Sequence, residues 1–363
     1  MEADPRHAEL VVKQLGLEES KTSSTPGVKL ARYCNVRGGD TEGGRSEDQN
    51  DVKDEGEEEM TAEDAKVYRG VVARLNYIAP ERVDIQYAVK EAARNMAKPR
   101  VKDWHALTRL GKYIKGRPRM VIKYGWQSLE GMVTTYTDSD WAGCTKTAKS
   151  TSGGIVMIGK HPIKSYSRQQ RTVALSSAEA ELHAMVAASA EALGIIGLCR
   201  DLGVKLEGEV YADSSAAIGI AQRSGKGKLR HLRVQALWVQ EVRCTKRLKY
   251  KKVLGTRNPA DLLTKHVPGE LLNAHLITLG VEFRGGRAES APTLDNIEAY
   301  TEEWEEELEG TELEGREATA SARCRKRPGG VSFHEIVSVR AIKAIGQRSV
   351  RRNPGTPTKW QRG

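Results

Sequence analysis

The sequence predicts a mixed α/β domain over residues 128–284, preceded by a helical segment over residues 61–127. Two patterns lead to this prediction. Residues 128–284 alternate strand-like runs, rich in β-branched residues, with helix-like runs, which is typical of an α/β domain. Residues 61–127 instead carry apolar residues at helical spacing. A chain of 363 residues is long enough for one or two domains with tails.

The composition agrees with a nucleic-acid partner but also with simple solubility. The formal net charge is +10, and a basic balance is expected of proteins that bind nucleic acids. The five cysteines are odd in number and form no CxxC pair, which argues against a disulfide framework and a zinc site. The N-terminus lacks an apolar signal region, and we expect no apolar run of about 18 residues, as a membrane span needs. We therefore expect a soluble intracellular protein, in the cytoplasm or the nucleus, that contacts no membrane.

The regions outside the α/β domain differ in composition. Residues 1–37 contain a helical pattern, HAELVVKQLGL, that is followed by a Thr-Pro-Gly turn. Residues 38–60 are Gly-rich and acidic with almost no apolar content, so we interpret them as a disordered linker. Residues 285–363 hold an acidic run, a basic run and a Pro/Gly-containing end, and we expect them to be a mostly disordered tail. Within the helical segment the expected helices cover residues 68–78, 84–96 and 104–115.

The α/β domain begins with a predicted antiparallel meander of three strands. The first runs from Met132 to Thr137 and is rich in β-branched residues, and the others cover residues 151–158 and 163–167. Gly153 and Gly154 are expected to weaken or bend the second strand.

The first strand ends in two aspartates. Alternation sends Tyr136 and Asp138 to one face, so Asp138 and Asp140 end the strand on the same side. Aspartates at a strand end are often only turn formers, and both interpretations are open on this pattern alone.

A long Ala-rich helix follows the meander and carries two glutamates near its start. Ser176 with Glu179 three residues later is a capping-box pattern. Glu179 and Glu181 point about 200° apart on a helix, so they cannot address the same site. If Ser176 is the N-cap, Glu179 is occupied at the helix start and Glu181 is left free for chemistry.

Two further aspartates lie where a strand gives way to a helix. Asp213 ends a strand in VYADSSAAIGIA, with Ser214 or Ser215 opening the next helix. Asp261 lies at the expected start of a helix in NPADLLTKH. Each could be an ordinary N-cap or first-turn acid.

The order of these acids is more informative than any one of them. A strand-end Asp, a helix Glu, a strand-end Asp and a helix-start Asp follow one another within one α/β domain. Two divalent cations about 3.5–4 Å apart can stabilise the attacking and leaving oxygens of a phosphoryl displacement. Mg²⁺ prefers oxygen ligands such as these carboxylates.

Several strings in this sequence closely resemble the ribonuclease H domain of copia-type LTR retrotransposon Pol polyproteins. They are YTDSDWAGC, KSTSGGIVMIGKHPIKSYSRQQRTVALSSAEAEL, VYADSSAAIGIA and NPADLLTKH. Residues 61–127 resemble that family's segment connecting reverse transcriptase to ribonuclease H, and residues 1–37 resemble the end of the reverse transcriptase. The resemblance covers roughly residues 7–280, interrupted by the acidic linker.

The resemblance implies a ribonuclease H-like fold, with a five-stranded mixed sheet flanked by helices. It also implies two-metal-ion hydrolysis of the RNA strand of RNA–DNA hybrids, leaving 3′-hydroxyl and 5′-phosphate ends. Two Mg²⁺ ions, or Mn²⁺ in their place, would be the cofactors. By motif, the metal-binding and catalytic residues would be Asp138, Glu181, Asp213 and Asp261, and Asp140 would be a turn or supporting residue. The implied partners are an RNA–DNA hybrid and other parts of a retrotransposon polyprotein.

The chain departs from the family's usual pattern near the expected site. The family usually has an aromatic residue at Gly154, a Trp at Tyr166 and a Tyr at Leu182. It commonly has Lys-His-Ile-Asp where this chain has Arg230-His231-Leu232-Arg233. His231 is therefore a residue that contacts substrate or helps product leave, or else a passive surface residue.

Three functions are compatible with the sequence. The first is an active ribonuclease H, and the second is a catalytically decayed nucleic-acid-binding remnant of a retrotransposon polyprotein. The third is an interaction protein that uses its charged segments. The sequence shows no Tyr-x-Asp-Asp polymerase motif, no integrase-like zinc motif and no Asp-Thr/Ser-Gly protease motif, so we do not expect reverse transcription by this chain alone.

Overall fold

The structure is a computed structural model that describes residues 1–28, 58–128, 131–227, 231, 234–289 and 291. All of them belong to one unit, Met1–Ile297. The predicted acidic linker lies outside the described residues except for its last three positions. The predicted tail also lies outside them beyond residue 291.

A five-stranded mixed sheet forms the centre of the α/β part, in the order β4-β3-β2-β5-β6. The strands are β2 (Met132–Ser139), β3 (Thr151–Ile158), β4 (His161–Gln169), β5 (Glu207–Ala212) and β6 (Lys249–Lys252). The first three pair antiparallel, as the predicted meander requires, whereas β5 pairs parallel with β2 and β6 pairs parallel with β5. The prediction of a ribonuclease H-like fold, with a five-stranded mixed sheet flanked by helices, is confirmed.

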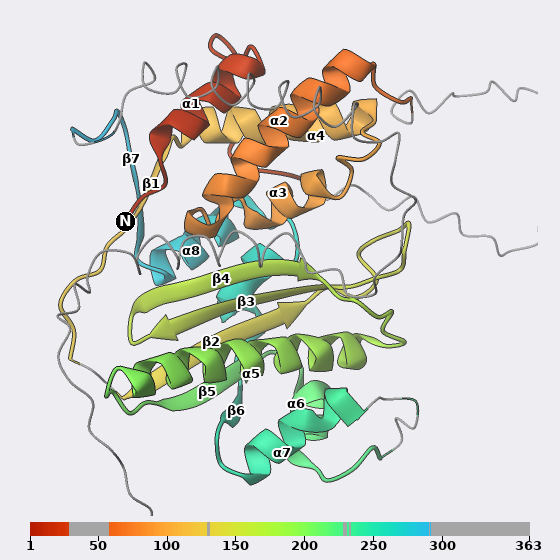
Figure 1. Ribbon diagram of the computed structural model, residues 1–363, viewed down its shortest axis with the longest axis vertical. Helices are drawn as coiled ribbons and strands as arrows, with labels where there is room; N and C mark the ends of the chain where they lie inside the picture. Colours follow the sequence, from red (N-terminus) through yellow and green to blue (C-terminus); the bar gives the residue numbers. More distant parts are fainter. Residues whose placement is uncertain (29–57, 129–130, 228–230, 232–233, 290, 292–363) are drawn as a thin grey trace, which may run out of the picture. The chain divides into compact units, whose positions relative to one another are not determined.

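The helix α5 (Ser177–Asp201) runs along this sheet (Figure 1). It begins where the sequence predicts, because the Ser176 hydroxyl accepts a hydrogen bond from the backbone N–H of Glu179. Its apolar side packs on the sheet in a dry core with α6 (Ser215–Gln222) and α7 (Trp238–Cys244). Central members of this core are Val133, Val156, Leu182, Met185, Ala188 and Val210. Burial of such side chains, at about 25 cal/mol per Å² of apolar surface, holds α5 in place.

The same helix corrects one expectation from the sequence. By length and composition alone, α5 is apolar enough to cross a membrane, and among the described residues no other helix passes that test. One such helix is weak evidence, because the core helix of a soluble protein passes too. Leu182, Met185, Ala188 and Ala192 are fully buried in the core, which accounts for the apolar character of α5.

The helices that precede the sheet form a second core with its other face. They are α1 (Pro5–Gln14), α2 (Ala62–Ile78), α3 (Gln86–Ala93) and α4 (Val101–Gly116), and they agree with the predicted helical regions. Tyr68 and Leu75 of α2 share this core with Ile155 and Met157 of β3 and with α8 (Gly269–Thr278). Strand β1 (Arg119–Ile122) also pairs antiparallel with β7 (Val281–Arg284). The helical segment and the sheet therefore share one core, and the boundary at residue 128 stays a prediction.

A short 3-10 helix, η4 (Pro259–Leu263), stands where we predicted the start of an α-helix. Contacts with β2 hold η4 at both of its ends. The Asn258 side chain donates to the Thr137 carbonyl at 2.9 Å and accepts from the Ala260 N–H at 3.2 Å. At the other end, the Thr264 hydroxyl donates to the Asp138 carboxylate. With both ends held against β2, this segment forms a single tight turn.

Gly153 and Gly154 lie within β3 and do not interrupt its pairing, and the expectation that they weaken or bend the strand stays a prediction. The register is regular through both glycines, and the irregularity in the β3–β4 pairing lies between Val156 and Met157. A Cβ atom at Gly153 would lie 2.7 Å from the Leu263 Cβ and 2.8 Å from the Thr264 Cγ2. Glycine is therefore required here because η4 approaches the strand closely.

Replacing Gly153 by alanine should disturb this contact. We expect Gly153→Ala to lower the free energy of unfolding by about 1–3 kcal/mol, because an extra methyl group in a tight contact forces neighbours to shift. Gly194→Ala is the matched control, since an added Cβ there meets nothing within 4 Å. It lies inside α5, where alanine should be neutral or stabilise by about 0.5–1 kcal/mol. Urea denaturation of both variants checks this, and equal stabilities would contradict the close approach of η4.

Candidate metal centre

The parallel pairing of β2 with β5 brings two of the predicted acids together. Tyr136 of β2 is in register with Tyr211 of β5, and their rings stack with centroids 5.4 Å apart. Asp138 and Asp213 each follow their tyrosine by two positions, so they emerge at the same end of neighbouring strands. The Ser214 hydroxyl caps α6 by accepting from the Ala217 N–H at 3.2 Å, so Asp213 is not needed as the cap.

The start of α5 supplies the third acid. The carboxylate of Glu179 accepts a hydrogen bond from the Leu175 N–H at 2.9 Å, so it is occupied at the helix start, one residue earlier than in a standard capping box. Glu181 points elsewhere and accepts from the Ser139 N–H at 3.3 Å. The prediction that Glu179 and Glu181 separate in this way is confirmed.

Asp138, Glu181 and Asp213 form a group that could hold a metal ion. One carboxylate oxygen from each lies within 4.8 Å of the others. Asp138 is 2% exposed and Glu181 5%, and the Glu181 Oε2 is buried without a hydrogen-bond partner among the described residues. Buried polar atoms are rarely left unsatisfied, and hard divalent cations take oxygen ligands. The residues present therefore fit a divalent cation.

The protonation of these acids reflects their crowding. Burial raises the pKa of Glu181 to about 9, and the charges of Asp138 and Asp213 add to the effect. Burial also raises the pKa of Asp213, again with a contribution from Asp138. A bound cation would favour the ionised forms, because metal ligands must be deprotonated.

The fourth predicted acid, Asp261, lies beside Asp138 but outside the three-acid group. It is buried on η4, and burial together with the charge of Asp138 raises its pKa to about 7. The ammonium of Lys265 lies 3.0 Å from the Asp261 Oδ1 and 3.6 Å from the Asp138 Oδ2. Burial alone would lower the pKa of Lys265, but Asp138 and Asp261 outweigh it and raise that pKa.

Sequence reasoning missed Thr264 and Lys265 as members of the site. Both contact Asp138 in the structure. The signal was present, because Lys265 follows Asp261 by four residues, a spacing at which opposite charges meet on a helical turn.

His231 was predicted as a substrate contact or a passive surface residue. Its Nε2 lies 3.0 Å from the Glu179 Oε2, so it contacts the capping glutamate and not one of the four acids. Its side chain is 42% exposed. The other three residues of the motif, Arg230, Leu232 and Arg233, lie outside the described residues, and a role for His231 in substrate binding stays a prediction.

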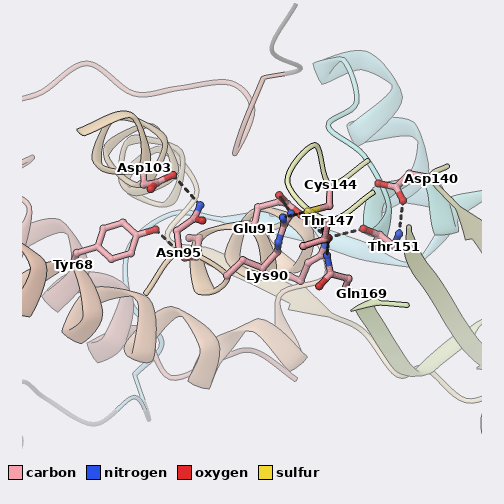
Figure 2. A network of polar contacts seen from close by, with 12 residues as sticks. Tyr68, Lys90, Glu91, Asn95, Asp103, Asp140, Cys144, Thr147, Thr151 and Gln169 are labelled. Atoms are coloured by element: carbon pink, nitrogen blue, oxygen red, sulfur yellow. Dashed lines mark hydrogen bonds and ion pairs between the residues drawn. The ribbon is translucent and has the colours of Figure 1, made fainter. Parts of the chain in front are cut away.

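Asp140 acts as a turn residue, as we expected. Its carboxylate accepts from the Thr151 N–H, as part of a network of polar contacts that reaches α3 (Figure 2). In that network Lys90 donates to the Thr151 hydroxyl at 2.7 Å. Arg94 contacts the thiol of Cys144, which also accepts from the Thr147 hydroxyl at 2.9 Å. The helical segment thus holds the β2–β3 connection next to the candidate site.

Two departures from the family's usual pattern are accommodated by packing. The ring of Tyr166 occupies the space into which a side chain at position 154 would extend. Leu182 is fully buried in the core between α5 and the sheet. Neither substitution removes a described contact of the acids.

The fold and the acid group define a ribonuclease H-like domain with a candidate metal centre. No protein-family model matches the sequence. The chain is 33% identical over 207 residues to the retrovirus-related Pol polyprotein from transposon RE2 of Arabidopsis thaliana. It is 32% identical over 208 residues to that from transposon TNT 1-94 of Nicotiana tabacum. Each match covers 56% of this chain, but the chain spans only 14% and 16% of these two relatives. Over these residues the chain is similar to the retrovirus-related Pol polyproteins of transposons.

Two solved structures are similar in fold. One is LC11-RNase H1, isolated from compost, with 18% identity and a TM-score of 0.31. The other is the N-terminal ribonuclease H domain of a Mycobacterium tuberculosis protein, with 18% identity and a TM-score of 0.29. The similarity covers 40% and 41% of this chain and 99% of each of those chains.

The pKa values of two glutamates near the start of α5 are shifted in opposite directions, which gives a test of the site. Glu181 has a folded pKa of about 9 against an ordinary 4.5, so the metal-free protein should lose stability as pH rises through that window. Glu179 has a lowered pKa: burial opposes this, but hydrogen bonds from His231 and Leu175 outweigh it, so its ionised form stabilises the fold above the ordinary pKa.

In EDTA at pH 8 we therefore expect Glu181→Gln to raise the melting temperature and Glu179→Gln to lower it. A change of about 1 kcal/mol corresponds to roughly 2–4 °C for a unit of this size. Thermal melts between pH 5 and 9 provide the measurement. A lower melting temperature for Glu181→Gln at pH 8 would show that burial does not raise the pKa of Glu181 in the folded protein.

Proposed function

We propose that this chain is a ribonuclease H that hydrolyses the RNA strand of RNA–DNA hybrids with divalent metal ions. The observation that carries the proposal is the group of three carboxylates within 4.8 Å at one end of the sheet. Asp261 beside Asp138 extends this group to the four acids of the family's motif. Mg²⁺ suits such an all-oxygen site, with Mn²⁺ as the alternative ion.

Each acid has a definite part in this proposal. Asp138 is the central ligand, because it belongs to the group with Glu181 and Asp213 and also interacts with Asp261. A two-ion form would place one ion among Asp138, Glu181 and Asp213 and the other between Asp138 and Asp261. When bound, such ions activate a water molecule and neutralise charge on the scissile phosphate.

The partners follow from the same proposal. The substrate would be an RNA–DNA hybrid, and the net charge of +10 favours contact with its phosphates. Other parts of a Pol polyprotein would be protein partners, because the chain spans a small fraction of its relatives.

A second candidate function is hybrid binding without cleavage, as expected of a decayed copy. The observation in its favour is that one basic residue, Arg233, stands where the family commonly has an acid. The four carboxylates are all retained, so we rank catalysis first.

The direct test is cleavage of a hybrid with a labelled RNA strand. We expect cleavage that EDTA stops and Mg²⁺ restores, and we expect Asp138→Asn and Glu181→Gln each to lower it to the uncatalysed background. Asp201→Asn, at the exposed C-terminal end of α5, is the control and should cleave at the wild-type rate. Full activity in both site variants would refute the site assignment. Salt-sensitive hybrid binding without any Mg²⁺-dependent product would favour the decayed copy.

A further inference from the structure

A lysine side chain lies between two of the four acids. The Lys265 ammonium is 3.0 Å from the Asp261 Oδ1 and 3.6 Å from the Asp138 Oδ2. Asp138 and Asp261 are also the pair that would hold the second cation of a two-ion mechanism. The lysine thus stands where that cation would bind.

Several contacts fix the position of Lys265. Lys265 comes shortly after η4 and four residues after Asp261, which η4 carries. Its other partner, Asp138, lies on β2. The preceding residue, Thr264, is fully buried and donates to the same Oδ2 oxygen of Asp138. Two consecutive side chains therefore engage the same oxygen of Asp138, Oδ2.

The charges of the site agree with this arrangement. The four carboxylates carry four negative charges when they are ionised. Among the described residues, the ammonium of Lys265 lies within 4 Å of two of them, Asp138 and Asp261. The three-acid group of Asp138, Glu181 and Asp213 has no such cation within salt-bridge distance of Glu181 or Asp213 among the described residues. The three-acid group therefore leaves a place for a divalent ion, while the Asp138–Asp261 pair already has a positive charge.

We propose that Lys265 is a built-in cation that takes the place of the second divalent ion, so that the protein without nucleic acid binds one divalent ion. This inference rests on the proposed metal site. It makes Lys265 a positioning residue, which orients Asp138 towards the three-acid group. The ordinary alternative is an ion pair that only stabilises η4, in which case removal of the lysine would not create a new ion site.

Calorimetric titration of the full chain with Mn²⁺, in the absence of nucleic acid, separates these two cases. We expect one site-specific ion per chain for the wild type and two for Lys265→Met. Lys265→Arg keeps the charge and should bind one. The matched control is Lys251→Met, because Lys251 is 48% exposed, against 47% for Lys265, and also pairs with a carboxylate, Glu209 at 2.7 Å. Asp138→Asn lacks the central ligand. The Mn²⁺ that it still binds measures non-specific binding to acidic runs elsewhere in the chain and serves as the blank.

The double variant Lys265→Met/Asp261→Asn should return to one ion and locates the second site. One ion in Lys265→Met, with the fold confirmed by circular dichroism, would overturn the inference, and so would two ions in the wild type. If Lys265→Met does not fold, Lys265→Gln gives the same decision with a polar replacement. Failure of the proposed metal site can be distinguished from failure of this inference. A wild-type protein that binds no ion above the Asp138→Asn blank lacks the metal site itself. A wild-type protein that binds ions, but in a number other than expected, contradicts only the role of Lys265.

Discussion

The repulsion among buried carboxylates is the constraint on which the rest of this structure depends. Two like charges about 4 Å apart repel by about 4 kcal/mol at an effective dielectric constant of 20, and a whole domain is stable by only about 5–15 kcal/mol. Asp138 and Glu181 are almost completely buried, and one carboxylate oxygen of each lies within 4.8 Å of the other and of one from Asp213. The fold must therefore hold these side chains together against an energy comparable with a large part of its own stability. Burial raises the pKa of Glu181 to about 9, and the charges of Asp138 and Asp213 add to the effect.

Several separate elements supply the restraint. The parallel register of β2 and β5 aligns Asp138 with Asp213, and the capped start of α5 turns Glu181 inward while Glu179 remains at the helix end. On the other face, η4 can approach β3 because position 153 has no side chain. That approach brings Asp261 and Lys265 to Asp138. The two cores, one under α5 and one under the helical segment, clamp the strand that carries Asp138 from both faces.

Much of this could be predicted from the sequence because the signals are local. β-Branched alternation gave β2 and β3, and the Ser176–Glu179 spacing both located the start of α5 and separated its two glutamates. What could not be predicted depends on contacts between distant segments. The 3-10 form of η4 depends on bonds from Asn258 and Thr264 to β2, and the close approach of Leu263 to β3 depends on the glycine at position 153. The core shared by α2 and β3 is likewise invisible to periodicity, which reports that a face is apolar but not what covers it.

The central claim is that the three-acid group is a binding site for a divalent cation. The most direct measurement is anomalous X-ray scattering from crystals of the protein grown with Mn²⁺ and without nucleic acid. We expect an anomalous peak within coordination distance of oxygens from Asp138, Glu181 and Asp213. A well-ordered crystal that shows these three carboxylates but no peak among them would contradict it.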